Sequence, residues 1–253
     1  MTTPAHSRPA LAWLLTRAAL SQVMSDNQTK EMLSGSVIYE LLQPGQQPLP
    51  GISADPVISF SSAAALTRAV TGGEIPVGTY GVLYDPEAWS YTPAAEQQDP
   101  VAAATEAAAA AHARGLRFIV APALNLSTVL APGNGSRGQT FLQLGLIGKL
   151  AKVADIVELQ AQSLERDTDA YASFVSAATE QAAEAHPGVT VLAGLSTNPP
   201  GAPVSTQGLL AAVAATRSVV DGYWLNIPGQ GPRCPTCNAS RPDIAIQTLQ
   251  QLG

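Results

Sequence analysis

Two carboxylates follow a short apolar segment in the first half of the chain. Residues 81–84, Gly-Val-Leu-Tyr, are predicted to form a buried strand, and Asp85 and Glu87 come directly after it. In barrels of alternating strands and helices, the chemistry takes place at the carboxyl ends of the strands. Carboxyl groups in that position suit general acid and base catalysis, with or without a carboxylate nucleophile. The alternative for this pair is a structural one, in which the two acids cap a helix or hold a loop through backbone N–H groups.

Further polar and aromatic side chains stand at the ends of the other predicted strands. Glu158 is a third candidate catalytic carboxyl, and Gln160 and Gln162 share its face because side chains alternate along a strand. Polar side chains on one face are unfavourable in a dry core, so we expect a solvent-filled mouth. Because Tyr39 and Glu40 are adjacent, only one of them can face inward. The candidate substrate-binding residues are Tyr39, Glu40, Tyr84, Trp89, Asn125, Gln160, Gln162, Trp224 and Asn226, and Ser196 and Asn198 also stand at a strand end.

The chemical character of these side chains predicts the ligand. Asn and Gln both donate and accept hydrogen bonds, as the hydroxyl groups of a sugar require. Trp and Tyr rings can stack on the apolar face of a sugar. We therefore expect a neutral ligand, either a glycan or a small molecule.

Other reaction classes lack the residues they need. The histidines are His6, His112 and His186, in an N-terminal tail and on two predicted helices, so none stands beside a nucleophile at a strand end. Zinc catalysis lacks ligands for the same reason. Phosphoryl transfer lacks a phosphate-binding loop and a Lys/Arg clamp. We expect carboxylate catalysis without a metal or cofactor.

Charge and hydropathy limit the partners. Lys and Arg number 13 against 19 Asp and Glu, a net charge of −6, and no basic cluster offers a nucleic-acid surface. No run approaches the roughly 18–20 apolar residues of a membrane span. The apolar run 11–15 is cut short by Arg17, so we expect no signal peptide. The chain is then either cytoplasmic or the mature part of a secreted protein, and its oligomeric state is left open.

Two cysteines form a single C-x-x-C sequence near the C-terminus. Cys234 and Cys237 lie in a loop rich in glycine and proline. A disulfide that closes the loop, two free thiols, and a redox or metal role are all open interpretations.

The elements that would position these residues alternate along the chain. The strands are near-continuous hydrophobic runs, typical of a parallel sheet covered on both faces. This alternation over 253 residues predicts a single (β/α)8 TIM barrel domain spanning 1–253. The alternative is an open doubly wound parallel sheet, but the glycine signature after its first strand is missing. Strands are predicted at 9–15 (or the start of a helix), 36–42, 56–60, 81–85, 116–122, 155–160, 189–195 and 222–227, and helices at 26–33, 61–70, 100–112, 141–153, 168–185, 206–218 and 242–252.

A short motif at the fourth predicted strand resembles a known signature. Asp85-Pro86-Glu87 is similar to the end of the D-x-x-D-x-D-x-E signature of chitinase-type glycoside hydrolases, which are (β/α)8 barrels. Trp224 stands on the eighth strand, where that family keeps a tryptophan as the floor of the sugar site. The resemblance implies that Glu87 protonates the glycosidic oxygen and that Asp85 orients the substrate's acetamido group, the nucleophile. Tyr80 and Leu83 occupy the positions of the two earlier aspartates.

Together these features favour a glycoside hydrolase-like barrel. Glu87 would be the acid, Asp85 its helper and Glu158 a possible partner across the barrel. One alternative is a catalytically silent barrel that binds a glycan or small molecule with the same mouth. Another is a lyase, cyclase or isomerase that acts on a secondary metabolite.

Overall fold

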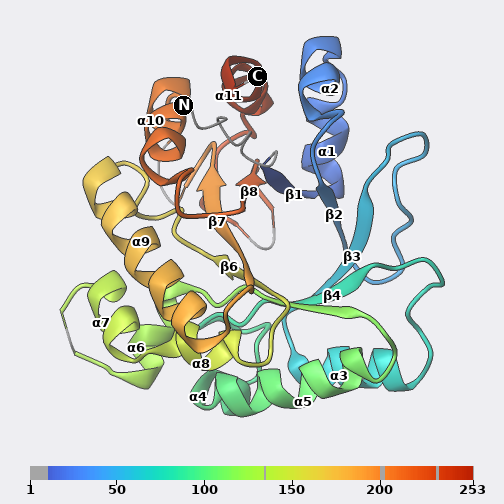
Figure 1. Ribbon diagram of the computed structural model, residues 1–253, viewed down its shortest axis with the longest axis vertical. Coiled ribbons are helices and arrows are strands. Elements are labelled where there is room, and N and C mark those ends of the chain that lie inside the picture. The colour runs from blue at the N-terminus through green and yellow to red at the C-terminus, as the bar shows by residue number, and fades with distance from the viewer. Residues whose placement is uncertain (1–10, 134, 200–202, 232–233, 253) are drawn as a thin grey trace, which may run out of the picture.

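Eight parallel strands close into a barrel in the computed structural model, which describes residues 11–133, 135–199, 203–231 and 234–252 (Figure 1). Each strand pairs with the next in sequence, and β1 pairs with β8. This closure confirms the predicted (β/α)8 TIM barrel and excludes the open sheet. The strands are β1 (Ala12–Thr16), β2 (Ile38–Leu42), β3 (Asp55–Phe60), β4 (Gly81–Tyr84), β5 (Arg117–Val120), β6 (Ile156–Leu159), β7 (Thr190–Ser196) and β8 (Gly222–Asn226).

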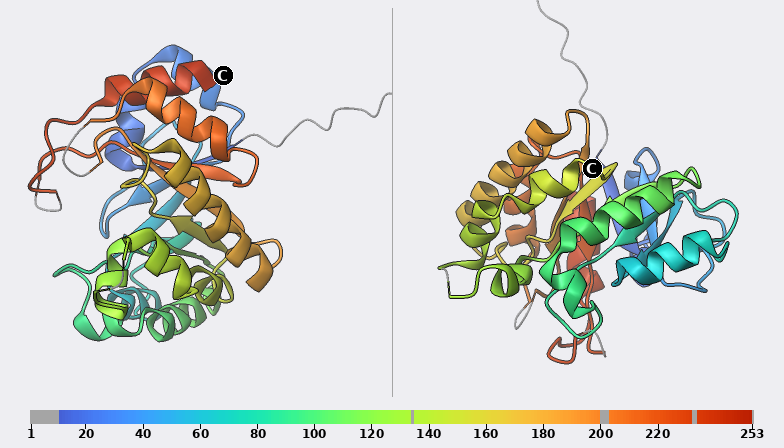
Figure 2. Two further views of the ribbon diagram at one scale, coloured as in Figure 1. Left: turned by 90° about the vertical axis from the view of Figure 1, so that its left-hand side faces the viewer. Right: turned by 90° about the horizontal axis from the view of Figure 1, so that it is seen from below.

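Helices connect the consecutive strands, except β2 and β3, which are joined by the loop 43–54, and they lie outside the barrel (Figure 2). The alanine-rich helix predicted at 100–112 is confirmed residue for residue, with Pro100 in its first turn and Asp99 accepting a hydrogen bond from the backbone of Ala102. None of the described helices is long and apolar enough to cross a membrane. The helices are α1 (Arg17–Val23), α2 (Asn27–Leu33), α3 (Ala63–Thr71), α4 (Ala94–Gln98), α5 (Pro100–His112), the 3-10 turn η1 (Leu124–Leu126), α6 (Ser127–Leu130), α7 (Arg137–Gln143), α8 (Leu146–Ala151), α9 (Thr168–Ala185), α10 (Thr206–Thr216) and α11 (Pro242–Leu252).

Three local differences from the sequence-based prediction have clear physical causes. Strand β1 begins at Ala12 and extends to Thr16, one residue beyond the predicted segment 9–15, of which residues 9 and 10 lie outside the described residues. Helix α1 follows at once because the Thr16 hydroxyl caps it by accepting from the backbone N–H of Ala19 at 3.2 Å. The helix predicted at 141–153 is divided into α7 and α8 by Gly145, whose φ of +58° breaks the right-handed geometry. Helix α7 also begins earlier than predicted, after Ser136, whose hydroxyl accepts from the N–H of Gln139.

Side chains alternate between the barrel interior and the surrounding helices. On β6, Ile156 belongs to the interior cluster, while Val157 and Leu159 belong to the layer beneath the helices. Glu158 therefore points into the barrel, one step below the next inward position, Gln160. The alternation determines which polar residues can reach the mouth of the barrel.

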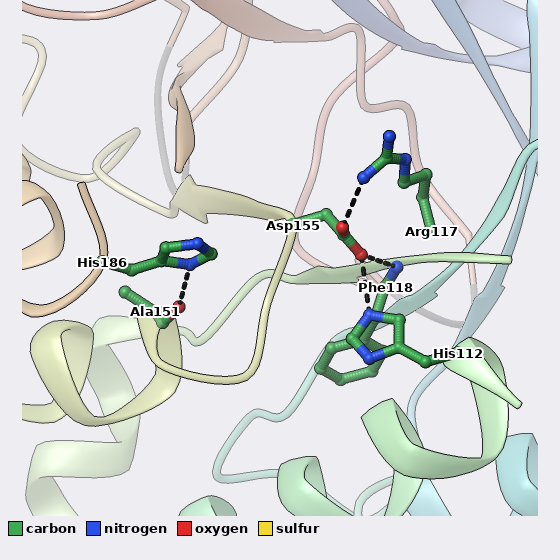
Figure 3. A network of polar contacts seen from close by, with 6 residues as sticks. All are labelled: His112, Arg117, Phe118, Ala151, Asp155 and His186. Carbon is green, nitrogen blue, oxygen red and sulfur yellow. Dashed lines mark hydrogen bonds and ion pairs between the residues drawn. The ribbon is translucent and has the colours of Figure 1, made fainter. Parts of the chain in front are cut away.

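A polar network ties the elements together at the amino ends of β5 and β6 (Figure 3). The carboxylate of Asp155 accepts from the Arg117 guanidinium at 2.7 Å and from the Phe118 N–H at 2.8 Å, and it contacts His112 Nε2 at 2.9 Å. His186 Nδ1 lies 2.9 Å from the carbonyl oxygen of Ala151. Both described histidines thus make contacts within the scaffold, at the end of the barrel opposite the strand ends that hold the candidate acids; His6 lies outside the described residues.

Candidate active site

A polar cavity of about 260 Å³ lies at the carboxyl ends of β4 to β8. Glu87 contributes its carboxylate, and amide side chains come from four different strand ends. The predicted site residues that line the cavity are Glu87, Asn125, Gln160, Gln162 and Asn226, and Ser196 and Asn198 join them. The cavity is smaller than the ~300–1,000 Å³ of a drug-sized site, so it fits one small polar ligand.

Glu87 is positioned by the loop that leaves β4. Its backbone N–H donates to the hydroxyl of Thr92 at 3.1 Å, and that hydroxyl also accepts from the indole N–H of Trp89 at 3.0 Å. Asn125 accepts from the backbone N–H of Ala88 at 2.9 Å, and its Nδ2 lies 3.4 Å from Glu87 Oε2. These contacts fix the loop and direct the Glu87 carboxylate toward Asn125 in the cavity wall.

Asp85 lies beside the cavity and is held by Gln160. The Gln160 amide donates to Asp85 Oδ1 at 2.6 Å and to the carbonyl oxygen of Ala121 at 2.7 Å. Asp85 itself is only 5 % exposed. One amide thereby connects the ends of β4, β5 and β6 and determines the orientation of the aspartate.

Glu158 is fully buried one layer below the mouth. Neither of its carboxyl oxygens has a hydrogen-bond partner among the described residues. Burial, and then the nearby carboxyl groups of Asp85 and Glu87, raise the pKa of Glu158 well above its usual value. Glycine at position 194 makes room for this group, because a Cβ there would lie 2.8 Å from Glu158 Oε1 and 2.5 Å from the amide carbon of Gln162. Three carboxyl groups thus gather at one side of the barrel mouth, and burial disfavours the charged form of the deepest.

The sequence interpretation missed a second buried acid. Glu165 follows β6 in a polar run that looks like an exposed loop, yet its carboxylate is buried and accepts from the backbone N–H of Ser196 at 2.8 Å. Burial raises its pKa to about 9. No periodicity or motif in the sequence marks this residue. Its contact fixes the end of β7, where Ser196 enters the cavity wall.

Replacing Glu165 by glutamine is expected to change how stability depends on pH. Glu165 stays protonated in the folded protein up to a pKa of about 9, whereas in the unfolded chain it ionises near 4.5. The free energy of unfolding therefore falls as pH rises between these values, by up to ~1.4 kcal/mol per pH unit from this group. Glu165→Gln keeps the acceptor for Ser196 and removes the proton, so urea unfolding at pH 5.5 and 8 should show a smaller loss of stability in the variant. Equal losses in both proteins would contradict this account.

Arg137 also lines the site, although it is not among the residues singled out from the sequence. It is the first residue of α7 and lines the same cavity as Glu87. Cys234 and Cys237 line the cavity too and are joined in a disulfide, so they are not two free thiols. No group of three or more His, Cys, Asp or Glu within the described ranges is placed to hold a metal ion.

Besides Asp85 and Glu158, five of the predicted site residues do not line the cavity. Tyr39 faces the barrel interior with its ring 5.5 Å from that of Tyr80, and Glu40 faces outward and accepts from the N–H of Leu49. Tyr84 points toward the helices and donates to Glu96 at 3.1 Å, as alternation requires when Asp85 points inward. The other two are Trp89, held by Thr92, and Trp224, which is buried in the interior cluster.

Strand stagger explains the depth of Trp224. In the β7–β8 pairing, Trp224 is opposite Gly194, whereas the cavity is lined by the next inward pair, Ser196 and Asn226. The indole therefore lies one layer below the wall of the cavity. The sequence shows that Trp224 faces inward but not how deep it lies, because depth depends on the stagger of neighbouring strands.

Comparisons with known proteins show the fold. No family model and no curated protein sequence matches the chain. A protein of Bacteroides thetaiotaomicron assigned provisionally to the α-L-fucosidases has a TM-score of 0.57 at 9 % identity, covering 100 % of this chain and 95 % of its own. The catalytic domain of a family GH18 chitinase from the fern Peteris ryukyuensis has a TM-score of 0.55 at 12 % identity, covering 95 % and 98 %. A sugar phosphate isomerase/epimerase of Parabacteroides distasonis has a TM-score of 0.52 at 8 % identity, covering 99 % and 95 %. At these identities, the chain is similar to glycosidases and isomerases alike in being a (β/α)8 barrel.

Proposed function

We propose that this protein hydrolyses a glycosidic bond in the cavity at the carboxyl ends of β4 to β8. The observation that carries the proposal is the convergence of Glu87 with Asn125, Gln160, Gln162 and Asn226 on one small polar cavity. Amides there provide donors and acceptors for sugar hydroxyls, and a carboxyl group provides the proton that a departing alcohol needs. The preferred ligand is a neutral sugar or glycan.

In this mechanism Glu87 is the general acid. It donates a proton to the glycosidic oxygen as the bond from that oxygen to the anomeric carbon breaks. Water then adds to the anomeric carbon and gives its proton to the Glu87 carboxylate, which restores the acid. Asp85, oriented by Gln160, stabilises the positive charge that develops on the sugar ring. Glu158 is too deeply buried to activate water, so we assign it a positioning role beneath Asp85 and Glu87.

The second candidate is a barrel that binds a sugar without cleaving it. It is favoured by Tyr80 and Leu83 at the positions where the similar signature has carboxylates. Leu83 lies in the apolar interior cluster and Tyr80 packs against it, so neither can replace an acid. The cavity would then serve only for recognition.

A paired measurement separates the two candidates. A panel of glycosides and short oligosaccharides is screened by thermal shift, and each stabilising compound is then incubated with the protein and analysed for released sugar. Hydrolysis predicts both a rise in Tm and release of the sugar. A rise in Tm without release supports the binding barrel. No rise in Tm and no release with any sugar contradicts both.

A further inference from the structure

A second cavity adjoins the polar one at the same end of the barrel. It has a volume of about 440 Å³ and lies between α7 and α9. The two cavities have Leu124, Arg137 and Ser163 in common, so they share part of one wall. A ligand in the polar cavity therefore has a neighbouring space into which a substituent can extend.

The second cavity differs in chemical character from the first. Leu142, Leu164 and Phe174 contribute to its walls, and its surface is mostly carbon. The polar cavity, in contrast, has amide side chains from four different strand ends and the carboxylate of Glu87 in its walls, beside Leu124, two prolines and the disulfide. A mixed cavity with many polar groups beside a mostly apolar one fits an amphipathic ligand, with a hydrophilic part in the first and an apolar part in the second.

Arg137 and Leu124 form the boundary between the cavities. The Arg137 side chain is exposed and lines both spaces, and a guanidinium group can stack on the face of an aromatic ring. Leu124 directly precedes Asn125, whose amide lies beside the Glu87 carboxylate. The shared wall is thus close to the group that would protonate the leaving oxygen.

We infer that the apolar cavity holds the aromatic aglycone of a glycoside whose sugar occupies the polar cavity. This inference rests on the proposed function and names its substrate class, an aryl or arylalkyl glycoside. The aglycone contacts Leu142, Leu164 and Phe174, and its ring stacks on Arg137. The glycosidic oxygen then lies at the shared wall.

The test compares methyl and benzyl glycosides of the same sugar. Their leaving alcohols have similar acidity, so a difference between them reports contacts of the phenyl ring. Binding of each to the wild-type protein is measured by calorimetry for glucose, N-acetylglucosamine and fucose, and hydrolysis is followed separately. For the sugar that binds, the benzyl glycoside is expected to bind about tenfold tighter or more, because the ring is removed from water.

Two variants fill the apolar cavity from α9. Ser173 and Ala170 are exposed residues in its wall, and Ser173→Trp or Ala170→Trp should abolish the benzyl preference while leaving the affinity for the methyl glycoside unchanged. Ser176→Trp, at an exposed position of the same helix outside the cavity wall, is the matched control and should retain the preference.

The outcomes separate this inference from the proposed function. Equal affinity of the wild-type protein for both glycosides, a preference that survives in both filled variants, or no binding of any glycoside would overturn it. A benzyl preference lost in the filled variants but without hydrolysis of either compound would support the aglycone site and refute the hydrolase.

Discussion

The variant Glu87→Gln is expected to lose about 10²–10⁴-fold in kcat on alkyl glycosides, the usual contribution of a general acid. Glutamine has the same shape and can still accept the hydrogen bond from Asn125. Its amide is not acidic, however, so it cannot transfer a proton to the leaving oxygen. The fold should be unaffected, because the backbone contact of this residue with Thr92 does not involve the side chain. Steady-state kinetics on the sugar identified by the thermal-shift screen, together with Tm, measure both effects.

The acid role has a further signature in the leaving group. Nitrophenolate is a stable anion and can leave a nitrophenyl glycoside without being protonated, whereas benzyl alcohol cannot. Glu87→Gln should therefore lose much less activity on nitrophenyl glycosides than on benzyl glycosides. Glu106→Gln is the control, since it makes the same change of charge at an exposed position on α5 and should keep full activity. A Glu87→Gln protein with wild-type turnover of alkyl glycosides would remove this residue from the mechanism.

Gly222→Ala is expected to be among the most destabilising single changes in the barrel. Gly222 pairs with Ala12 where β8 meets β1, and a Cβ at position 222 would overlap the carbonyl oxygen of Ala12. The obstacle is backbone and cannot rotate away, so the two closing strands must separate. We expect this overpacking to lower the free energy of unfolding by about 3 kcal/mol, which corresponds to a Tm lowered by roughly 6–12 °C for a domain of this size.

A glycine in open space provides the comparison. Gly35 has no heavy atom within 4 Å of the place that a Cβ would occupy, and its φ is not positive, so Gly35→Ala should leave Tm nearly unchanged. Thermal unfolding followed by circular dichroism measures both variants. Similar Tm values for the two would show that the seam between β1 and β8 can adjust to a methyl group.

The fold was predictable because each strand carries its own local signal. β-branched and apolar runs alternate with helices that begin at recognisable caps, such as Ser62 at α3 and Asp99 at α5. Helix α1 escaped prediction because Thr16 is both the last residue of β1 and the cap of the helix, so no loop separates the two. The division at Gly145 was missed because a glycine within a helical pattern does not reveal its φ.

The sequence predicted which side chains stand at the ends of the strands, but not how far below the mouth of the barrel each one lies. The carboxylates after β4 and the amides after β5, β6 and β8 were found because strand ends can be read from the sequence. Tyr84 and Asp85 are adjacent and point to opposite faces of the sheet, so they cannot both face the cavity. Because Asp85 points inward, Tyr84 points toward the helices, and the sequence does not show which of the two faces inward. Trp224 and Glu165 depend on strand stagger and on packing between distant segments, which a single sequence does not encode locally.

The separation between the Asp155 network and the cavity has a consequence for how this protein can diversify. Asp155, Arg117 and His112 tie the scaffold together at one end of the strands, and the loops that carry the reacting groups leave from the other. Substitutions that change ligand preference can therefore accumulate in the loops at the carboxyl ends of the strands, while substitutions at the amino ends change thermal stability independently. In directed evolution, the loops at the two ends of the barrel could be randomised in separate libraries. The selected substitutions could then be combined with nearly additive effects, because the two sets are far apart.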